Sequence, residues 1–181
     1  MSNEVGGERI GKYFTSLGFL WKGVLGYLAY VTIFPSWLAA WIHKARGVRI
    51  GNVRTVYIAP NVLIDSTFPE CVTIGDHVYI TRGAKVIAHT TFTRPVQEIV
   101  GVEYMLGPVE IREGAYIGVN ALIMPSVTIG RCAIVAAGAV VTRNVAEYEI
   151  VAGSPARKIG DVRQLAQKIE SRRDATPRGR E

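Results

Sequence analysis

The chain has 181 residues, of which 49% are hydrophobic and 20% charged; this is enough to bury a core in one domain with extensions and excludes a disordered tail. Its net charge of +6 is unevenly placed, since residues 1–50 carry six Lys or Arg against two Glu, residues 51–156 seven against nine acids, and residues 157–181 eight against four. A slightly acidic centre between basic flanks argues against a nucleic-acid-binding core and suits a phosphorylated ligand or a membrane surface better.

The N-terminal region is apolar and predicted to be helical. Residues 12–46 read as helix broken near Pro35, with Ser36 as a candidate cap after the break. Residues 23–42 contain no charge, which is long enough for a membrane-inserted segment, and three tryptophans could anchor at a bilayer interface. We therefore expect residues 1–46 to form an apolar helical extension that either associates with a membrane through residues 13–42 or caps the domain that follows.

The first residues do not resemble a secretory leader. Glu4 and Glu8 lie among the first fifteen residues, and no small-residue cleavage site follows the apolar stretch. We expect a cytoplasmic protein, peripheral to the inner face of a membrane or anchored in it if the extension is an anchor.

A repeat of six residues dominates the second half of the chain. From Ile111 the hexads read IREGAY, IGVNAL, IMPSVT, IGRCAI, VAAGAV and VTRNVA, each opening with Ile or Val and carrying a small or β-branched residue at the fifth position. The same register appears earlier at Ile58, Ile64, Ile74, Ile80 and Val86. Three short strands joined by tight turns make one triangular coil of about eighteen residues, with the aliphatic side chains stacked inside. We predict an all-β domain, a left-handed parallel β-helix, over residues 47–160.

Glycine recurs at the second hexad position, and the repeat is interrupted twice. Gly75, Gly118 and Gly130 are expected to serve turn dihedrals that other residues adopt at a cost. The register slips by four residues between Ile64 and Ile74, and the repeat vanishes in an excursion loop at about 91–108. Such excursions are usually functional or disordered. After the repeat, the amphipathic pattern of residues 161–171 predicts a C-terminal helix. A frayed basic tail is expected from there to residue 181.

The end of the repeat carries a specific signature. VVTRNV at 140–145 is followed by AGSPARKI at 152–159. With the hexads, this ending resembles the hexapeptide-repeat acyltransferases over about residues 48–159, in particular the maltose, galactoside and other sugar O-acetyltransferases. The resemblance implies a homotrimer with active sites between neighbouring β-helices, acetyl-CoA as co-substrate, a small-molecule or saccharide acceptor, and a place in polysaccharide biosynthesis.

Acetyl transfer needs a base, and the chain has three histidines. His43, in the apolar N-terminal region, is expected at a surface or interface, and His77 in an exposed turn slot that in such repeats commonly holds Asn. His89 closes a coil directly before the excursion, where the resembled enzymes keep their base, so we expect His89 to be catalytic. Its spacing from Val86 is shorter than in the sugar acetyltransferase pattern, which weakens the assignment of the acceptor.

Other site residues follow from the resemblance. Asp65 matches an acidic residue that helps bind the acceptor, although Asp also favours turn caps. Glu98 and Glu103 in the excursion could orient His89 or be merely solvated. Gly118 or a neighbour could supply the oxyanion N–H. The residues expected to contact acetyl-CoA are Gly118, Ala137, Thr142, Arg143, Arg157 and Lys158.

Three alternatives stay open or are excluded. A carbonic-anhydrase-type zinc site on this fold needs three histidines from adjacent coils, and no histidine follows His89, so we expect no metal. A non-catalytic trimeric scaffold on a membrane would use the apolar extension. An N-acetyltransferase acting on an amino sugar or amino acid would use the same base.

Overall fold

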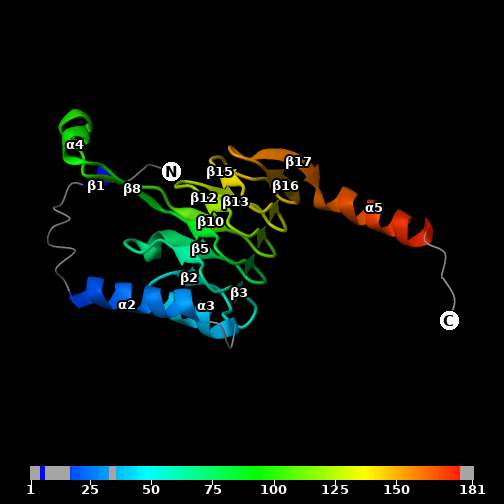
Figure 1. The fold of residues 1–181 in the computed structure, drawn as a ribbon, viewed down its shortest axis with the longest axis horizontal. Helices are drawn as coiled ribbons and strands as arrows, with labels where there is room; N and C mark the ends of the chain where they lie inside the picture. The colour runs from blue at the N-terminus through cyan, green and yellow to red at the C-terminus, as the bar shows by residue number, and fades with distance from the viewer. Residues whose placement is uncertain (1–4, 7–16, 33–35, 176–181) are drawn as a thin grey trace.

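The computed structural model describes residues 5–6, 17–32 and 36–175. Helices α2 (Leu17–Val31) and α3 (Ser36–Ala45) come first, and the strands of the repeat follow. An arm consisting of β8 (His89–Thr91), α4 (Arg94–Val100) and β9 (Tyr104–Leu106) leaves the repeat, and α5 (Val162–Ala175) ends the described chain (Figure 1).

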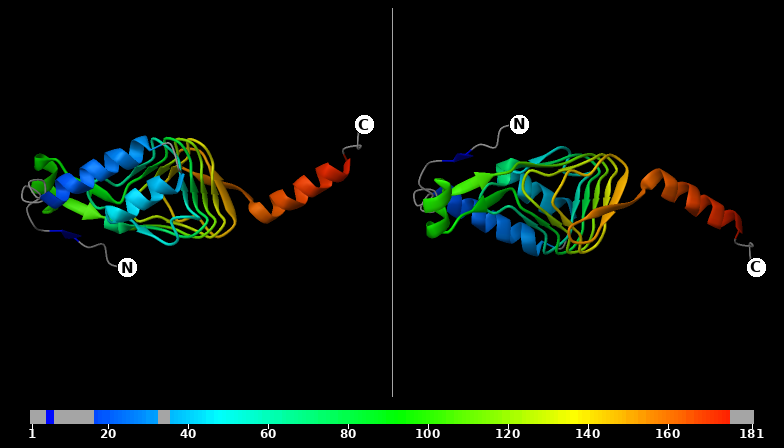
Figure 2. Two further views of the ribbon diagram at one scale, coloured as in Figure 1. Left: turned by 90° about the horizontal axis from the view of Figure 1, so that it is seen from below. Right: turned by 90° about the horizontal axis from the view of Figure 1, so that it is seen from above.

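Three parallel sheets form the sides of a β-helix (Figures 1 and 2). The first side contains β2 (Arg49–Ile50), β5 (Val72–Ile74), β10 (Val109–Ile111) and β13 (Thr128–Ile129). The second contains β3 (Tyr57–Ile58), β6 (Tyr79–Ile80), β11 (Tyr116–Ile117), β14 (Ile134–Val135) and β16 (Glu149–Ala152), with β17 (Arg157–Asp161) antiparallel at its edge. The third contains β4 (Leu63–Ile64), β7 (Lys85–Val86), β12 (Leu122–Ile123) and β15 (Val140–Val141). Each of the first four coils contributes one strand to each side.

The hexad positions make the core, as predicted. Ile58 pairs with Ile80, Ile80 with Ile117, and Ile117 with Val135, so identical positions stack from coil to coil. These side chains are at most 2% exposed. The fifth positions are also buried, with Ala121 completely enclosed. A period of six therefore places two inward-facing residues on every short side of the triangle.

The second-position glycines have a different cause from the one expected. None of Gly75, Gly118 and Gly130 is among the residues with positive φ. A Cβ built on Gly118 would lie 2.5 Å from the backbone nitrogen of Ala137 in the next coil, and the other two are equally crowded. Close stacking of successive coils, and not a turn dihedral, requires glycine at these positions.

The two N-terminal helices pack against each other and cover the first coil (Figure 1). Helix α2 contacts β4, and α3 contacts β2 and β3, which is the capping arrangement. Within the described ranges, no helix is both long and apolar enough to cross a membrane. The expected start of the helical region at residue 12 and the break at Pro35 lie outside the described residues, and Ser36 is the first residue of α3.

The excursion is a structured arm and not an irregular loop. Strands β8 and β9 pair antiparallel, with His89 opposite Leu106, and β1 (Val5–Gly6) adds a third strand. Helix α4 caps the arm and ends at Gly101, whose φ of 76° is left-handed. At the other end α5 extends away from the β-helix and continues to Ala175, beyond the predicted 171, while residues 176–181 lie outside the description (Figure 2).

Candidate active site

His89 and Asp65 form a hydrogen-bonded pair at one corner of the β-helix. Asp65 follows β4 and His89 stands three residues after the end of β7, so adjacent coils bring them to the corner between the third and first sides. His89 Nδ1 lies 2.6 Å from Asp65 Oδ2. The His89 side chain is 19% exposed and that of Asp65 is fully enclosed. The imidazole therefore keeps one edge accessible while its other nitrogen is held.

The Asp65 carboxylate is saturated with donors. Its Oδ1 accepts from the backbone N–H groups of Thr67 at 3.0 Å and Phe68 at 2.9 Å. Its Oδ2 accepts from the N–H of Ala88 at 2.7 Å besides contacting His89. Burial raises the pKa of Asp65, but the hydrogen bonds from His89, Phe68 and Ala88 outweigh it and hold this pKa below its usual value. An ionised Asp65 makes His89 Nδ1 the protonated nitrogen, which leaves Nε2 free to accept a proton.

This geometry changes the expected role of Asp65. A fully enclosed carboxylate with both oxygens occupied by chain donors has no surface for a direct contact with an acceptor. Oδ1 of Asp65 caps the turn, as the alternative interpretation predicted, and Oδ2 contacts His89.

Aromatic rings flank the pair. The Phe68 ring meets the His89 ring edge-on at 5.3 Å between centroids and stacks on Tyr104 of the arm at 5.0 Å. Phe68 lies in the register slip that the sequence shows between Ile64 and Ile74, beside the 3-10 turn Pro69–Cys71. The slip thus supplies both the amide that binds Asp65 and a ring that packs on His89.

The buried guanidinium of Arg46 hydrogen-bonds the backbone of the Asp65 segment, and the sequence pattern did not predict this residue. Arg46, 2% exposed, donates from Nη1 to the Asp65 carbonyl oxygen at 2.9 Å, from Nη2 to the Ile64 carbonyl oxygen, and from Nε to His43 Nδ1 at 3.0 Å. Burial lowers the pKa of Arg46 to about 10, opposed by the charges of Asp65 and Glu70. No hexad regularity marks Arg46, because it precedes the repeat and bonds the carbonyl oxygens of Ile64 and Asp65, 18 and 19 residues away.

The expectation for His43 was wrong. It is 1% exposed, neither at the surface nor at an interface of the chain described. Burial, with the positive charge of Arg46, lowers its pKa to about 3, so His43 is neutral at pH 7. Nδ1 accepts from Arg46, and the proton of the neutral ring therefore sits on Nε2.

His77 and Glu98 fit simpler interpretations, while Glu103 is half-buried and its carbonyl oxygen accepts from the N–H of Phe92 at 2.9 Å. His77 is exposed, with a φ of 57°. It occupies the fourth position of its hexad, as Asn120 does in a later hexad with a φ of 56°. Glu98 lies exposed on α4, and the orienting contact of His89 comes from Asp65 instead. Across the described part of the chain no group of three or more His, Cys, Asp or Glu could hold a metal ion.

The residues expected to bind acetyl-CoA fall into two groups on opposite edges of the third side. Thr142 and Arg143 follow β15 and are exposed at the same corner as His89. The hydrogen bond from Met124 N–H to the Val141 carbonyl oxygen shows that the coils at this corner are stacked on one another. Because coils are about 4.8 Å apart, Thr142 stands about 10 Å above His89 along the axis. The other edge carries Gly118, Ala137, Arg157 and Lys158.

The second group is also compact. A Cβ on Gly118 would touch Ala137 N, and Ala137 itself is exposed. Arg157 pairs with Ala152, whose strand stacks on β14, and both Arg157 and Lys158 are exposed. Within one chain the structure brings each group together but separates the two groups by the width of a side.

Comparison with known proteins gives a consistent result. The model of the bacterial transferase hexapeptide (six repeats) family matches residues 108–143. Protein CapG of Staphylococcus aureus is 32% identical over 134 residues, covering 72% of this chain and 75% of CapG. The putative acetyltransferase YvoF of Bacillus subtilis is 31% identical over 109 residues, which span 60% of this chain and 59% of YvoF, less than two thirds of that relative.

Solved structures agree in fold. The hexapeptide-repeat acetyltransferase VCA0836 of Vibrio cholerae superposes with a TM-score of 0.60 at 19% identity, covering 80% of this chain and 90% of that one. The maltose O-acetyltransferase of Clostridium difficile 630 gives 0.61 at 18% identity, covering 83% and 91%. With its hexads, its parallel β-helix and its similarity to CapG, the chain belongs to the hexapeptide-repeat acetyltransferase family.

Proposed function

We propose that the protein is an acetyl-CoA-dependent O-acetyltransferase acting on a hydroxyl of a saccharide-type acceptor, with His89 as general base. The observation that carries the proposal is the 2.6 Å contact between His89 and an ionised, fully enclosed Asp65. Such a pair fixes the imidazole tautomer and stabilises the imidazolium that forms when the base takes a proton. In place of the expected acceptor contact, we propose Asp65 as the residue that positions His89.

The chemistry follows from this tautomer. His89 Nε2 accepts the proton of the acceptor hydroxyl as its oxygen attacks the thioester carbonyl carbon. The tetrahedral intermediate then expels the thiolate, which recovers the proton from His89, and the products are an acetyl ester and free thiol. The N–H of Gly118 itself donates to the Val135 carbonyl oxygen at 2.8 Å, so neighbouring backbone N–H groups, and not Gly118, are our candidates for holding the oxyanion.

The two groups of predicted CoA-binding residues support a shared site. A single chain separates the His89 corner from the Gly118 edge by a whole side of the β-helix. In a closed ring of three copies, the His89 corner of one copy would face the Gly118 edge of the next, so that each cleft would receive one group from each copy. Exposed Arg143, Arg157 and Lys158 suit the phosphates of CoA, because guanidinium matches phosphate oxygens bidentately.

An amine acceptor is the second candidate. A 2,3,4,5-tetrahydropyridine-2,6-dicarboxylate N-acetyltransferase of Staphylococcus aureus is 50% identical over 52 residues, although these are 29% of this chain and 22% of that enzyme. The same base serves nitrogen as well as oxygen. A galactoside acetyltransferase solved with coenzyme A shares the fold, with a TM-score of 0.61 at 17% identity, covering 84% of this chain and 86% of that one.

Calorimetry and thiol release test the proposal together. Acetyl-CoA is titrated into wild type, Arg157→Ala and the matched control Arg131→Ala, whose arginine is exposed on another turn. Thiol release is then followed with matched hydroxyl and amino sugars for wild type and His89→Ala. Turnover on hydroxyl sugars that disappears in His89→Ala supports the proposal. Turnover on amino sugars alone would make the protein an N-acetyltransferase. Absence of acetyl-CoA binding would leave the non-catalytic scaffold as the remaining interpretation.

A further inference from the structure

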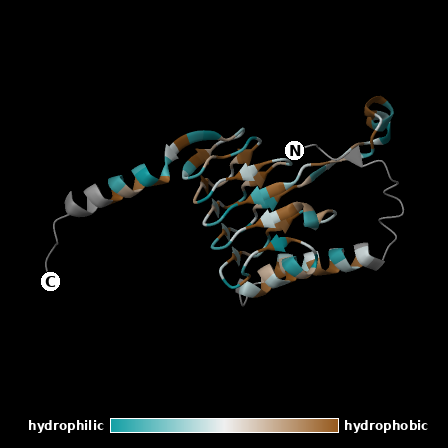
Figure 3. Ribbon diagram, turned by 180° about the vertical axis from the view of Figure 1, so that it is seen from behind, coloured by the Kyte–Doolittle hydropathy of each residue, from teal (hydrophilic) through white to brown (hydrophobic). Residues whose placement is uncertain are grey.

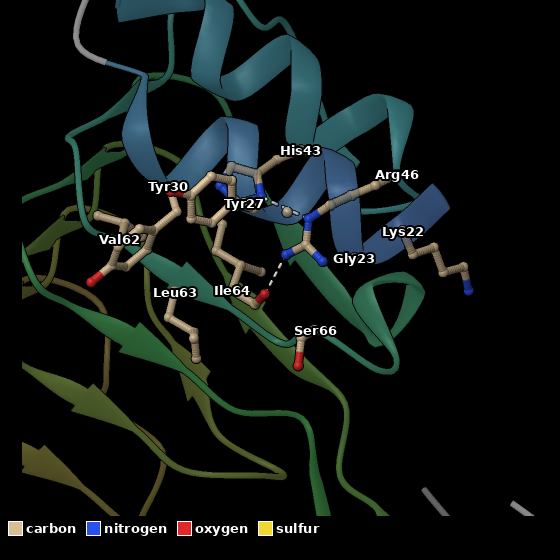
Figure 4. A pocket seen from close by; sticks show the side chains of 11 residues that line it. Lys22, Gly23, Tyr27, Tyr30, His43, Arg46, Val62, Leu63, Ile64 and Ser66 are labelled. Atoms are coloured by element: carbon tan, nitrogen blue, oxygen red, sulfur yellow. Dashed lines mark hydrogen bonds between the residues drawn. The ribbon is translucent and has the colours of Figure 1, made fainter. Parts of the chain in front are cut away.

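A cavity of about 260 Å³ lies between α2, the end of α3 and the β4 segment of the first coil, and its lining includes Ser66, the residue after Asp65 (Figure 4). Its walls are mostly carbon: Tyr27 and Tyr30 from α2 face Val62, Leu63 and Ile64 of the β4 segment. This volume equals that of about nine liquid water molecules at ~30 Å³ each, so it can hold part of an organic molecule. It is separate from the hydrogen-bonded pair described above.

One buried polar group in the lining is unsatisfied. His43 lines the cavity, and its Nε2 has no hydrogen-bond partner within the described structure. Because Nδ1 accepts from Arg46, this nitrogen is an N–H donor of a neutral ring. A buried donor without a partner is costly, and a ligand oxygen would satisfy it.

Two glycines keep the cavity open. Gly23 and Gly26 lie inside α2, where glycine is less favourable than alanine. Nothing lies within 4 Å of a Cβ built on Gly23, and on Gly26 the nearest atom is Arg46 Nη1 at 3.7 Å. Gly23 is exposed and lines the cavity, so its lack of a side chain leaves the cavity open to solvent at this point, and Gly26 leaves space beside Arg46.

The surroundings indicate how an apolar ligand would arrive. Hydrophobic residues run along α2 and α3 (Figure 3), and Trp21, Tyr27 and Trp41 are each more than half exposed. Residues 9–64 contain no Asp or Glu but seven Lys or Arg. Arg46 is buried and Lys22 pairs with Glu70 at 3.0 Å, so the charge available at the surface is smaller than this count. The exposed aromatic side chains suit a lipid interface, and the absence of acids from this stretch suits an anionic one.

We propose that this cavity binds the aliphatic tail of an amphiphilic acceptor, with an oxygen of that molecule accepting from His43 Nε2. Ser66 lines the cavity directly beside Asp65, whose carboxylate holds His89. A tail seated here can present its polar head to the His89 corner. The assignment of the occupant as acceptor rests on the proposed function; the binding of the tail does not.

Alkyl β-D-glucosides with methyl, hexyl and octyl chains, used below their critical micelle concentrations, are suitable probes. Calorimetry on wild type should give one saturable site whose affinity rises with chain length, about fourfold per buried methylene (about 0.8 kcal/mol), until the cavity is full. Gly23→Leu, which fills the open space, should weaken octyl glucoside binding at least tenfold. Val24→Leu, at a 46% exposed position of the same helix, is the matched control and should bind as wild type does.

Equal octyl glucoside binding in wild type and Gly23→Leu would overturn the proposal, because the chain would then lie on the outer face of the helices. A change of oligomeric state in Val24→Leu, seen by sedimentation, would overturn the lipid-facing interpretation and assign that face to a second copy. Thiol release separates the two proposals. Tail binding without turnover would overturn the proposed transferase function and leave the cavity as a binding site for the tail. Turnover with the same KM for methyl and octyl glucosides would overturn the assignment of the cavity to the acceptor's tail and keep the transferase.

Discussion

Replacing Asp65 by Asn keeps the shape of the side chain but exchanges one acceptor oxygen for a donor. The remaining oxygen can still accept from Thr67 and Phe68, whereas the new NH₂ meets the N–H of Ala88 and the protonated Nδ1 of His89. Hydrogen bonds to a charged group contribute about 1.5–3 kcal/mol each, so losing two of them should lower the free energy of unfolding by about 3–6 kcal/mol. The imidazole can relieve the clash only by moving its proton to Nε2, which removes the base.

Kinetics measure that loss. We expect kcat for thiol release to fall by about 10²–10⁴, the range that general bases contribute, with the KM for acetyl-CoA little changed.

The pH dependence of the free energy of unfolding is a second readout. Because the folded pKa of Asp65 is lowered, its contribution is present above the usual Asp pKa of about 3.9 and is lost as pH falls through the folded value, a loss that Asp65→Asn should lack. Asp76→Asn, at an exposed turn where the carboxylate accepts one N–H, is the control. A kcat within threefold of wild type in Asp65→Asn would refute the reasoning.

Three other predictions concern separate parts of the chain. His43 has its pKa lowered from 6.5 to about 3, so wild-type stability in urea should fall as pH drops through that window, by up to about 1.4 kcal/mol per unit, and His43→Gln should flatten the fall. Gly130→Ala should cost about 1–3 kcal/mol by thermal unfolding, because its Cβ would lie 2.5 Å from Glu147 N, whereas Gly23→Ala, in open space on a helix, should gain up to about 1 kcal/mol. Arg157→Ala should raise the Kd for acetyl-CoA about tenfold by calorimetry while kcat at saturation stays within threefold; an unchanged Kd would remove Arg157 from the phosphate site.

The β-helix was predictable because its determinants are local and periodic. Every aliphatic residue that opens a hexad is buried, and His77 lies in an exposed turn as predicted, with a φ of 57°. The same logic failed for the glycines, because stacking between coils and turn dihedrals favour the same residue. Only the built Cβ at Gly118, 2.5 Å from Ala137 N, distinguishes them.

The arm and the support behind Asp65 depend on contacts without a period. Strands β8 and β9 are three residues each, too short for alternation to predict them, although Thr90, Thr91 and Tyr104 are residue types that favour strands. Arg46 in a basic, apolar segment reads as a surface charge. Its burial follows from two backbone carbonyls and one histidine nitrogen that only the folded chain brings together.

A double-mutant cycle on Asp65→Asn and His89→Asn tests the central claim most directly. If Asp65 acts on the reaction through His89, the double variant should release thiol no more slowly than His89→Asn alone, because residues that act as a unit are strongly non-additive. Losses in kcat that simply multiply, or a His89→Asn variant as fast as wild type, would contradict the account.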